Sequence, residues 1–471
     1  MTAAIVVLDL GKTHSKLSFW SGDGRLIAKR ARANGTFSNQ STPFLDEKGI
    51  RTWLEESLTE MAQLGPIKSI MTIGHGAAAA IVRDGALVSP PMDYEGEIAD
   101  ELASSYRKLR DPFVQSGSPL LPQGLNLGAQ LFALESQIPD ALENAHVLLW
   151  PQYWAWVLSG VMASECSSLG CHTDLWNPIA GSPSGLATVR GWDKKLPPVR
   201  FAGASIGKLS EHWALLTGLS PNIDVYCGAH DSNAALVAAS RFDPVRHSDA
   251  TILSTGTWFV AMRKLGDDAA FEIGDLQSER DCLVNVDVNG RMVPSARFMG
   301  GREIEQLLDG EVNNLDCLTD QAALLSNVPL VVNSATMIMP SFAANVGPFP
   351  NTKGHWVNAP SCLSQRQTAI ALYAALVSDV MLELINSQRT ILIEGRFANC
   401  EVYVRALASL RPQAQIYVSR TAIDASFGAL CLVQGDLKPP QELLSVSPLE
   451  IDLSAYRSQW HQSAKALEAQ P

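Results

Sequence analysis

The sequence has few features of a secreted, membrane-bound or nucleic-acid-binding protein. Its eight cysteines include no Cys-x-x-Cys pair and no zinc-ligand spacing, which is typical of reduced thiols in a cytosol. The net charge of −12 argues against nucleic acid or an anionic membrane surface as a main partner. The N-terminus has no charged-then-apolar signal pattern, and low-complexity tracts are absent. We therefore expect a soluble, cytoplasmic protein.

Long uncharged apolar runs are also scarce. The most apolar stretch, TAIALYAALVSDVMLELI, is interrupted by Asp379 and Glu383, so we expect a buried helix and not a membrane span. A chain of 471 residues that is 46% hydrophobic exceeds what one core usually supports. We expect two domains, residues 1–240 and 241–471, in an α/β fold.

The opening stretch VVLDLGKTHSKLSFW is expected to contain the end of one strand and the start of the next. It contains Gly-Lys-Thr, as a phosphate-binding P-loop does, but Val6 stands where that motif needs a glycine. The residues after Thr13 alternate as in a strand, so we expect strand, tight turn, strand, with Asp9 at the end of the first strand and Gly11 in the turn. The pattern alone leaves open whether Asp9 and Lys12 are solvated or hold a phosphate.

The stretch DATILSTGTWFVAMRK repeats this device, with Gly256 in the position of Gly11. Two phosphate-sized turns in separate halves suggest a duplicated domain with a nucleotide held in a cleft between two lobes. The similarity is short, and chance resemblance remains an alternative.

Just before that second turn, VYCGAHDSNAALVAAS reads as a strand that ends at Gly228 and a helix from Asn233 to Ala239. Asp231 then lies at or near a helix N-terminus. One interpretation is a helix N-cap, a common position for Asp. The other is a general base, kept ionised by the helix dipole and nearby N–H groups.

Two further glycine sites each lead into a helix. Gly300 and Gly301 open an amphipathic helix with Ile304, Leu307 and Leu308 on one face, and Gly395 follows a buried strand. Helix N-termini of this kind are suited to phosphates, so the second half is predicted to bind a nucleotide.

Five segments, taken in order over nearly the whole chain, resemble the FGGY carbohydrate kinases of the actin, Hsp70 and sugar kinase superfamily. They are DLGKTHSK, GHGAAAAIVRDGALVSPPMDYEG, WPQYWAWVLSGVMASECSSLGCHTDLWNP, CGAHDSNAA and LSTGTW, and the last two are closest to the rhamnulokinase and fuculokinase branch. The resemblance implies two ribonuclease-H-like (actin-like ATPase) lobes, each with a mixed five-stranded sheet, and a central cleft. It assigns sugar mainly to the N-terminal lobe and ATP mainly to the C-terminal lobe.

The resemblance also implies MgATP-dependent phosphorylation of a sugar hydroxyl, and it indicates a ketose such as L-rhamnulose or L-fuculose, with xylulose and ribulose as further candidates. Asp231 would be the general base, and Asp9, together with Asp231, would hold Mg²⁺. The expected sugar contacts are His75, Gly76, Asp93, Tyr94, His230 and Asp231. The expected nucleotide contacts are Gly11, Lys12, Thr13, Lys16, Thr255, Gly256, Thr257, Gly300, Gly301, Gly395 and Asn399. A homodimer is expected because relatives are often dimers.

The sequence departs from the family pattern in two places. Arg396 and Phe397 stand where relatives have small glycine-rich residues, so they either stack on adenine or alter nucleotide preference. The sugar segment reads MDYE where relatives often carry an arginine, which leaves the sugar open. Tyr94 and Trp154 are candidates for stacking on a sugar or for the core.

Three other functions compete with this reading. Gly74-x-Gly76-x-x-Ala79 after a strand resembles a dinucleotide fingerprint, but the RDG that follows interrupts the required helix, which argues against an NAD-dependent dehydrogenase. A non-catalytic sugar sensor would not need Asp9, Lys12 and Asp231 together. An Hsp70-like ATPase would lack a sugar pocket.

Overall fold

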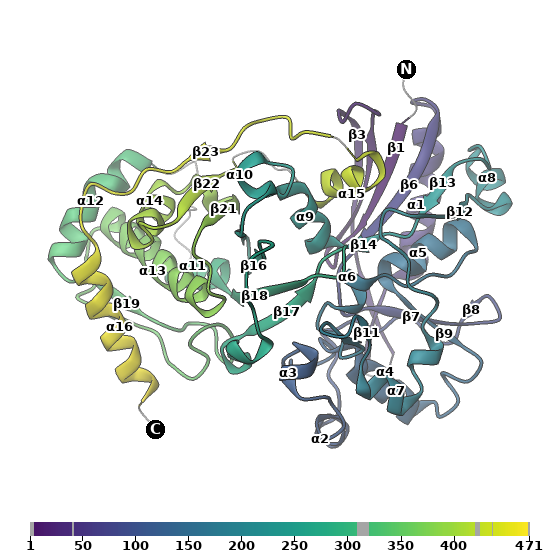
Figure 1. Ribbon diagram of the computed structural model, residues 1–471, viewed down its shortest axis with the longest axis horizontal. Coiled ribbons are helices and arrows are strands. Elements are labelled where there is room, and N and C mark those ends of the chain that lie inside the picture. The colour runs from purple at the N-terminus through teal and green to yellow at the C-terminus, as the bar shows by residue number, and fades with distance from the viewer. Residues whose placement is uncertain (1–3, 40–41, 309–319, 420–423, 436, 470–471) are drawn as a thin grey trace. The chain divides into compact units, whose positions relative to one another are not determined.

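The computed structural model describes residues 4–39, 42–308, 320–419, 424–435 and 437–469 (Figure 1). The chain forms two compact units. Unit 1 comprises Met1–Arg241, Val284–Met292 and Ile423–Pro439, and unit 2 comprises Phe242–Leu283, Val293–Ala422 and Pro440–Pro471. The division into a sugar-binding and an ATP-binding half stays a prediction.

The main sheet of unit 1 is mixed, with the spatial order β12-β13-β6-β1-β2-β3 and with β14 also paired to β6. The strands β1, β6, β13 and β14 run parallel, whereas β2, β3 and β12 are antiparallel to their neighbours. The predicted strand, turn and strand at the N-terminus are confirmed. The bounds are β1 (Ala4–Leu10), β2 (His14–Trp20), β3 (Leu26–Ala33), β6 (Ile67–Gly74), β12 (Ser205–Lys208), β13 (Asp224–Tyr226) and β14 (Ala229–His230).

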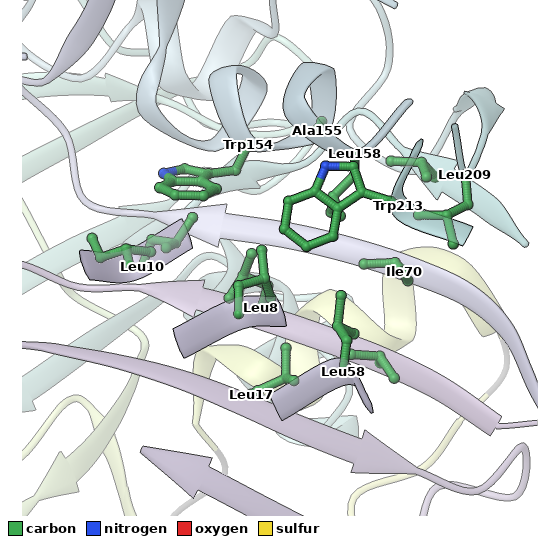
Figure 2. Packing of buried hydrophobic residues seen from close by; sticks show 14 of the residues in the cluster. Leu8, Leu10, Leu17, Leu58, Ile70, Trp154, Ala155, Leu158, Leu209 and Trp213 are labelled. Carbon is green, nitrogen blue, oxygen red and sulfur yellow. The ribbon is translucent and has the colours of Figure 1, made fainter. Parts of the chain in front are cut away.

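Both faces of β1 are buried, which explains why it reads as an almost continuous apolar run. Leu8 contributes to a core with helices α1 (Glu47–Ala62), α5 (Trp150–Ser159) and α8 (Glu211–Thr217) (Figure 2). Trp154 belongs to this core and is fully buried, so the core alternative for that residue holds and sugar stacking does not.

Val7 faces the opposite core, where α9 (Asp231–Ala239) and α15 (Ala425–Gln434) lie side by side (Figure 1). A Cβ on Gly428 of α15 would lie 1.7 Å from the carbonyl oxygen of Ala234 in α9. The absence of a side chain at this position therefore lets α15 press against the helix that begins with Asp231.

The segment after β6 continues as a strand and not as a helix. The strand β7 (Ala79–Arg83) follows β6 and pairs with β8 and β9, so the dinucleotide-binding alternative lacks its helix. The other elements of unit 1 are β4 (Thr36–Asn39), β5 (Thr42–Leu45), β8 (Ala86–Leu87), β9 (His146–Leu149), β10 (Trp176–Asn177), β11 (Ser182–Pro183), α2 (Asp100–Arg107), α3 (Phe113–Ser116), α4 (Leu127–Gln137), α6 (Cys166–Leu169) and α7 (Gly185–Arg190).

The second large sheet has the order β17-β18-β16-β15-β21-β22-β23, with β15 parallel to β21 and antiparallel to β16. Among the described residues each large sheet has seven strands, more than the five expected, because short strands such as β14 and β23 have too few residues to show a period. The bounds are β15 (Ala250–Thr255), β16 (Phe259–Lys264), β17 (Cys282–Val286), β18 (Met292–Phe298), β21 (Thr390–Gly395), β22 (Gln415–Val418) and β23 (Leu444–Ser445).

The apolar stretch around Asp379 forms α13 (Leu363–Leu384), and it is the one helix of the described residues long and apolar enough to cross a membrane. Its most apolar window is 89% buried within the protein, as expected of a core helix. The remaining elements of unit 2 are α10 (Asp243–Arg246), α11 (Gly300–Leu307), α12 (Gln321–Asn333), α14 (Glu401–Leu410), α16 (Ser454–Glu468), β19 (Met337–Met339) and β20 (His355–Val357).

Candidate active site

Three parallel strands of unit 1 end side by side. In the pairing register Leu10 of β1 and His230 of β14 both lie opposite Gly74 of β6. Residues at or just beyond the carboxyl ends of these strands therefore share one edge of the sheet, where α/β folds bind ligands. This edge carries Asp9, His75 and Asp231.

Asp9 is a buried carboxylate whose side chain lies 3.3 Å from the Lys16 ammonium. Burial raises the pKa of Asp9 to about 6, the Asp231 carboxylate adds to the rise, and Lys16 opposes it. Since β1 and β2 pair Asp9 directly with Lys16, the antiparallel register explains this contact. A second cation near Asp9 would stabilise the ionised form of this buried carboxylate.

Asp231 is the first residue of α9, and the N-cap position belongs to His230. Its Oδ1 accepts a hydrogen bond from the Ser232 backbone N–H at 2.6 Å, and 27% of the side chain is exposed. The carboxylate is therefore held at the positive end of the helix and reaches solvent. This geometry fits the general-base interpretation better than the N-cap interpretation.

His230 is buried beside Asp231, and both ring nitrogens have partners. Nδ1 lies 3.2 Å from Asn233 Nδ2, and Nε2 lies 3.2 Å from Cys171 Sγ and 3.3 Å from Asp231 Oδ1. Burial lowers the pKa of His230, which favours the neutral ring. Neither Asn233 nor Cys171 was among the predicted site residues. Asn233 could have been found, because it lies one helical turn after His230.

His75 follows β6 and is also buried. Its Nδ1 donates to the Gly76 carbonyl oxygen at 2.8 Å, so Nε2 is left as the acceptor of a ring that burial keeps neutral by lowering its pKa. The Tyr94 ring centroid lies 5.6 Å from that of His75. A Cβ on Gly76 would lie 2.6 Å from Cys171 Sγ, which explains the glycine.

Lys12 and Asp93, predicted for phosphate and sugar respectively, contact each other directly. The Lys12 ammonium also lies 3.5 Å from Glu95 and 5.2 Å from the Tyr94 ring centroid. The turn after β1 is thus tied to the MDYE segment. Lys12 and Asp93 are far apart in the sequence, so no local pattern could have predicted that they pair.

The backbone of the first turn is held by Asn34. Its Nδ2 donates to the Gly11 carbonyl oxygen at 2.7 Å, and its backbone N–H donates to the Thr13 carbonyl oxygen at 2.8 Å. Thr13 itself is exposed, with Oγ1 3.2 Å from His14 Nδ1.

In unit 2 the second turn joins β15 to β16. Gly256 and Thr257 are exposed, whereas Thr255 is buried with its hydroxyl donating to the Glu394 carbonyl oxygen at 2.6 Å and accepting from the Phe397 N–H at 3.1 Å. The Thr255 side chain thus joins two loops, and the phosphate contact expected of Thr255 stays a prediction.

The three other predicted glycines of unit 2 lie where backbones approach closely. A Cβ on Gly301 would lie 2.2 Å from the Gly256 carbonyl oxygen, and one on Gly395 would lie 2.4 Å from that of Thr255. Gly395 also has a φ of +89°. Gly300 packs on the Phe259 ring, which a Cβ would approach to 2.7 Å. These glycines bring the second turn, the start of α11 and the end of β21 together.

Comparison with known proteins decides between the alternatives. The family model for the carbohydrate kinase FGGY C-terminal domain matches residues 247–441. The crystal structure of a carbohydrate kinase from Novosphingobium aromaticivorans is 45% identical, covers 99% of this chain and 100% of that chain, and superposes with a TM-score of 0.95. The chain belongs to the FGGY carbohydrate kinase family. It is an ATP-dependent carbohydrate kinase, and the expected α/β fold of two actin-like lobes is confirmed.

More distant kinases share the fold. The xylulose kinase from Rhodospirillum rubrum is 17% identical, with a TM-score of 0.80 over 99% of this chain and 98% of that chain. The Plasmodium falciparum glycerol kinase with ADP is 12% identical, with a TM-score of 0.80 over the full length of both chains. These likenesses show the fold alone. The branch within the family stays a prediction.

The segment expected to contact adenosine contains a buried aromatic residue, Phe397. Phe397 is buried and packs on Phe259 with ring centroids 5.2 Å apart, so it belongs to the core and does not stack on a base. Arg396 lies over the Phe397 ring and 4.0 Å from Glu305. Asn399 is half-buried at the end of the 3₁₀ turn Arg396–Asn399.

The acidic residues of unit 1 fit a magnesium ion. No group of three or more His, Cys, Asp or Glu side chains arranged to hold a metal occurs in the described part of the chain. Mg²⁺ is usually bound through one or two carboxylates with water and substrate phosphates, and such a site needs no larger cluster. Asp9, buried beside Asp231 with a raised pKa, provides that donor set.

Proposed function

We propose that this FGGY kinase transfers the γ-phosphoryl group of MgATP to a hydroxyl of a ketose, such as L-rhamnulose or L-fuculose, with xylulose and ribulose as further candidates. The observation that carries the proposal is the position of Asp231. Its carboxylate is partly exposed at the carboxyl ends of three parallel strands, beside the buried carboxylate of Asp9.

In this reaction Asp231 accepts the proton of the sugar hydroxyl as its oxygen forms a bond to the γ-phosphorus. The bond from that phosphorus to the β,γ-bridging oxygen breaks, and ADP leaves with both electrons. Such transfers rely on positioning and on neutralising phosphate charge more than on covalent chemistry. An ionised carboxylate at a helix N-terminus suits the proton acceptor.

The metal site in this proposal consists of Asp9 and Asp231, and bound Mg²⁺ would neutralise phosphate charge. Lys16 compensates part of the Asp9 charge at 3.3 Å and so keeps that carboxylate ionised for the metal. Lys16 and the turn Gly11–Thr13 then serve the transferred phosphate.

The sugar subsite comprises His75, Gly76, Asp93 and Tyr94. His75 Nε2 is a neutral acceptor for one sugar hydroxyl, because Nδ1 already donates to Gly76. The Lys12 ammonium holds Asp93 and the Tyr94 ring in one group. A site of fixed donors and acceptors rejects analogues that lack the matching hydroxyl.

The nucleotide subsite comprises the exposed backbone of Gly256 and Thr257, the N-terminus of α11 at Gly300 and Gly301, and the loop from Gly395 to Asn399. A helix N-terminus with adjacent glycines is suited to phosphate oxygens. Arg396, exposed above Phe397, is the residue through which the departure from the family pattern would alter nucleotide preference.

A cytoplasmic location and a homodimeric state complete the proposal, and both rest on resemblance to the family.

Transfer requires the acceptor hydroxyl and the donor phosphate to meet in line.

A coupled assay of ADP formation over L-rhamnulose, L-fuculose, xylulose, ribulose and glycerol, each with ATP and with GTP, tests the proposal. We expect one ketose to give a kcat/KM at least tenfold above the others. Equal rates on all acceptors, or a best rate on glycerol, would contradict the ketose assignment.

A further inference from the structure

His230 lies between three side chains: its ring is hydrogen-bonded to Cys171 and Asn233 and lies within ion-pair distance of Asp231. Its Nε2 faces Asp231 Oδ1 at 3.3 Å and Cys171 Sγ at 3.2 Å, while Nδ1 faces Asn233 Nδ2 at 3.2 Å. Only 6% of the residue is exposed. A ring enclosed in this way has little surface left for a sugar, which was the role predicted for it from the sequence.

The contacts determine which ring nitrogen carries the proton. Asp231 is an acceptor when ionised, so Nε2 must carry hydrogen to interact favourably with it. Nδ1 is then the acceptor in the neutral ring and takes a hydrogen from the Asn233 amide. The opposite arrangement would place the Nε2 lone pair against the Asp231 carboxylate, with two acceptors 3.3 Å apart.

The amide of Asn233 agrees with this tautomer. Within the described residues its Oδ1 is buried and has no hydrogen-bond partner, so the whole polar contact of the side chain runs through Nδ2 to His230. Leaving a buried acceptor without a partner costs free energy. We infer that the hydrogen bond from Nδ2 to the His230 ring, and not a bond to Oδ1, sets the orientation of the Asn233 amide.

The hydrogen bonds to Asp231 distinguish its two oxygens. Among the described residues both hydrogen bonds to this carboxylate fall on Oδ1, from the Ser232 N–H at 2.6 Å and the Ser232 hydroxyl at 3.3 Å, and the His230 ring lies 3.3 Å from the same oxygen. These donors fix the plane of the carboxylate and leave Oδ2 to receive a proton.

We propose that His230 is a positioning residue that holds the carboxylate of Asp231, and that Asn233 sets the His230 tautomer. The inference rests on the proposed function, in which Asp231 is the base. His230 acts through Asp231 and does not bind the sugar. A displaced catalytic group can reduce turnover by roughly 10²-fold, so the loss should appear in kcat.

The test compares two substitutions of His230 that place an amide differently. In His230→Gln the side-chain amide nitrogen reaches the position of Nε2, whereas in His230→Asn it reaches that of Nδ1. We expect His230→Asn to lower kcat by roughly 10- to 100-fold with the ketose KM within about threefold of wild type. His230→Gln should recover most of that loss. A raised ketose KM at unchanged kcat in both variants would show a sugar contact and overturn the proposal.

A second measurement needs no His230 variant to be active. Two-bond ¹H–¹⁵N spectra of ¹⁵N-histidine protein, with His230→Gln used for assignment, report the ring tautomer directly. We expect a neutral Nε2–H ring in the wild type and a mixture of tautomers in Asn233→Leu, which is close in size. An Nδ1–H ring or an imidazolium in the wild type would overturn the proposal.

Measuring Asp231→Ala in parallel separates the two failures. If Asp231→Ala retains near-normal turnover, the proposed function fails. If Asp231→Ala loses turnover while His230→Asn keeps a normal kcat, only the positioning role of His230 fails.

Discussion

Asp9 and Asp231, which are far apart in the sequence, lie close enough for the charge of Asp231 to raise the pKa of Asp9. Parallel pairing of β1, β6 and β14 produces this proximity, since all three strands end at one edge. Two carboxylates in this relationship repel each other, and burial adds to the cost. A divalent cation relieves both effects, which connects the geometry to the proposed magnesium site.

Asp9→Asn should stabilise the metal-free protein at neutral pH while abolishing activity. The pKa of Asp9 is raised from 3.8 to about 6, so wild type loses stability as pH rises through about 6, and this loss is absent below about 4. We expect Asn to raise the free energy of unfolding by about 1–3 kcal/mol above pH 7, with the difference vanishing near pH 4. Denaturation across pH tests this, with Asp23→Asn as control because the pKa of Asp23 is lowered. A difference that grows on acidification would contradict it.

Asp231→Ala should lower kcat by roughly 10²–10⁴-fold while the sugar still binds, as expected for a lost general base. Steady-state kinetics gives kcat, and calorimetry gives ketose affinity. Asp224→Ala is a matched control, since the Asp224 side chain is 28% exposed against 27% for Asp231. Near-normal turnover in Asp231→Ala would refute the assignment.

Gly256→Val should weaken ATP binding without disturbing the fold. Among the residues that the structure describes, a Cβ at Gly256 would meet only the Trp258 carbonyl oxygen, at 3.7 Å, so the added side chain projects from the turn. We expect the KM for ATP to rise roughly tenfold or more, equivalent to ~1.4 kcal/mol, with the ketose KM nearly unchanged. Gly274→Val, in an equally open position of unit 2, is the control. Equal losses for both substrates in a folded protein would count against the assignment of this turn to the nucleotide.

Asp379→Asn should destabilise unit 2 without changing either KM. Asp379 is completely buried in α13 and accepts hydrogen bonds from Arg411 Nη1 at 2.8 Å and Arg457 Nε at 2.7 Å. Removing its charge leaves Arg411 buried without its counter-ion, so we expect a loss of about 3–5 kcal/mol in urea denaturation. Glu383→Gln, which affects a more exposed partner of Arg457, should cost at most about 1 kcal/mol. Similar losses in the free energy of unfolding in both variants would show that burial of the Asp379–Arg411 pair does not determine the cost.

Local patterns in the sequence predicted much of the architecture. The alternation after Thr13 and the apolar run before Asp9 gave the first two strands, because period and burial are local properties. The helix after Gly301 is present, with Ile304 and Leu307 buried as expected. The helix around Asp379 was predicted as buried, and it is.

Contacts between distant segments could not be read from the chain. Lys12 and Asp93 each carry a charge suited to a substrate, and nothing local indicates that they pair with each other. Phe397 has an aromatic ring of the kind that can stack on a base. Its burial against Phe259 depends on how β16 and β21 are placed in one sheet, which the local sequence does not indicate. Likewise, nothing local indicates that the Thr255 hydroxyl joins two loops, and the predicted phosphate contact of Thr255 stays a prediction.

The most direct test of the account is ³¹P NMR of the reaction of wild type and Asp231→Ala with MgATP and the preferred ketose. The account predicts a sugar phosphate formed in equal amount with ADP by the wild type, no ADP without the sugar, and almost no product with Asp231→Ala. ADP that appears without sugar, or sugar phosphate formed at the same rate by Asp231→Ala, would contradict it.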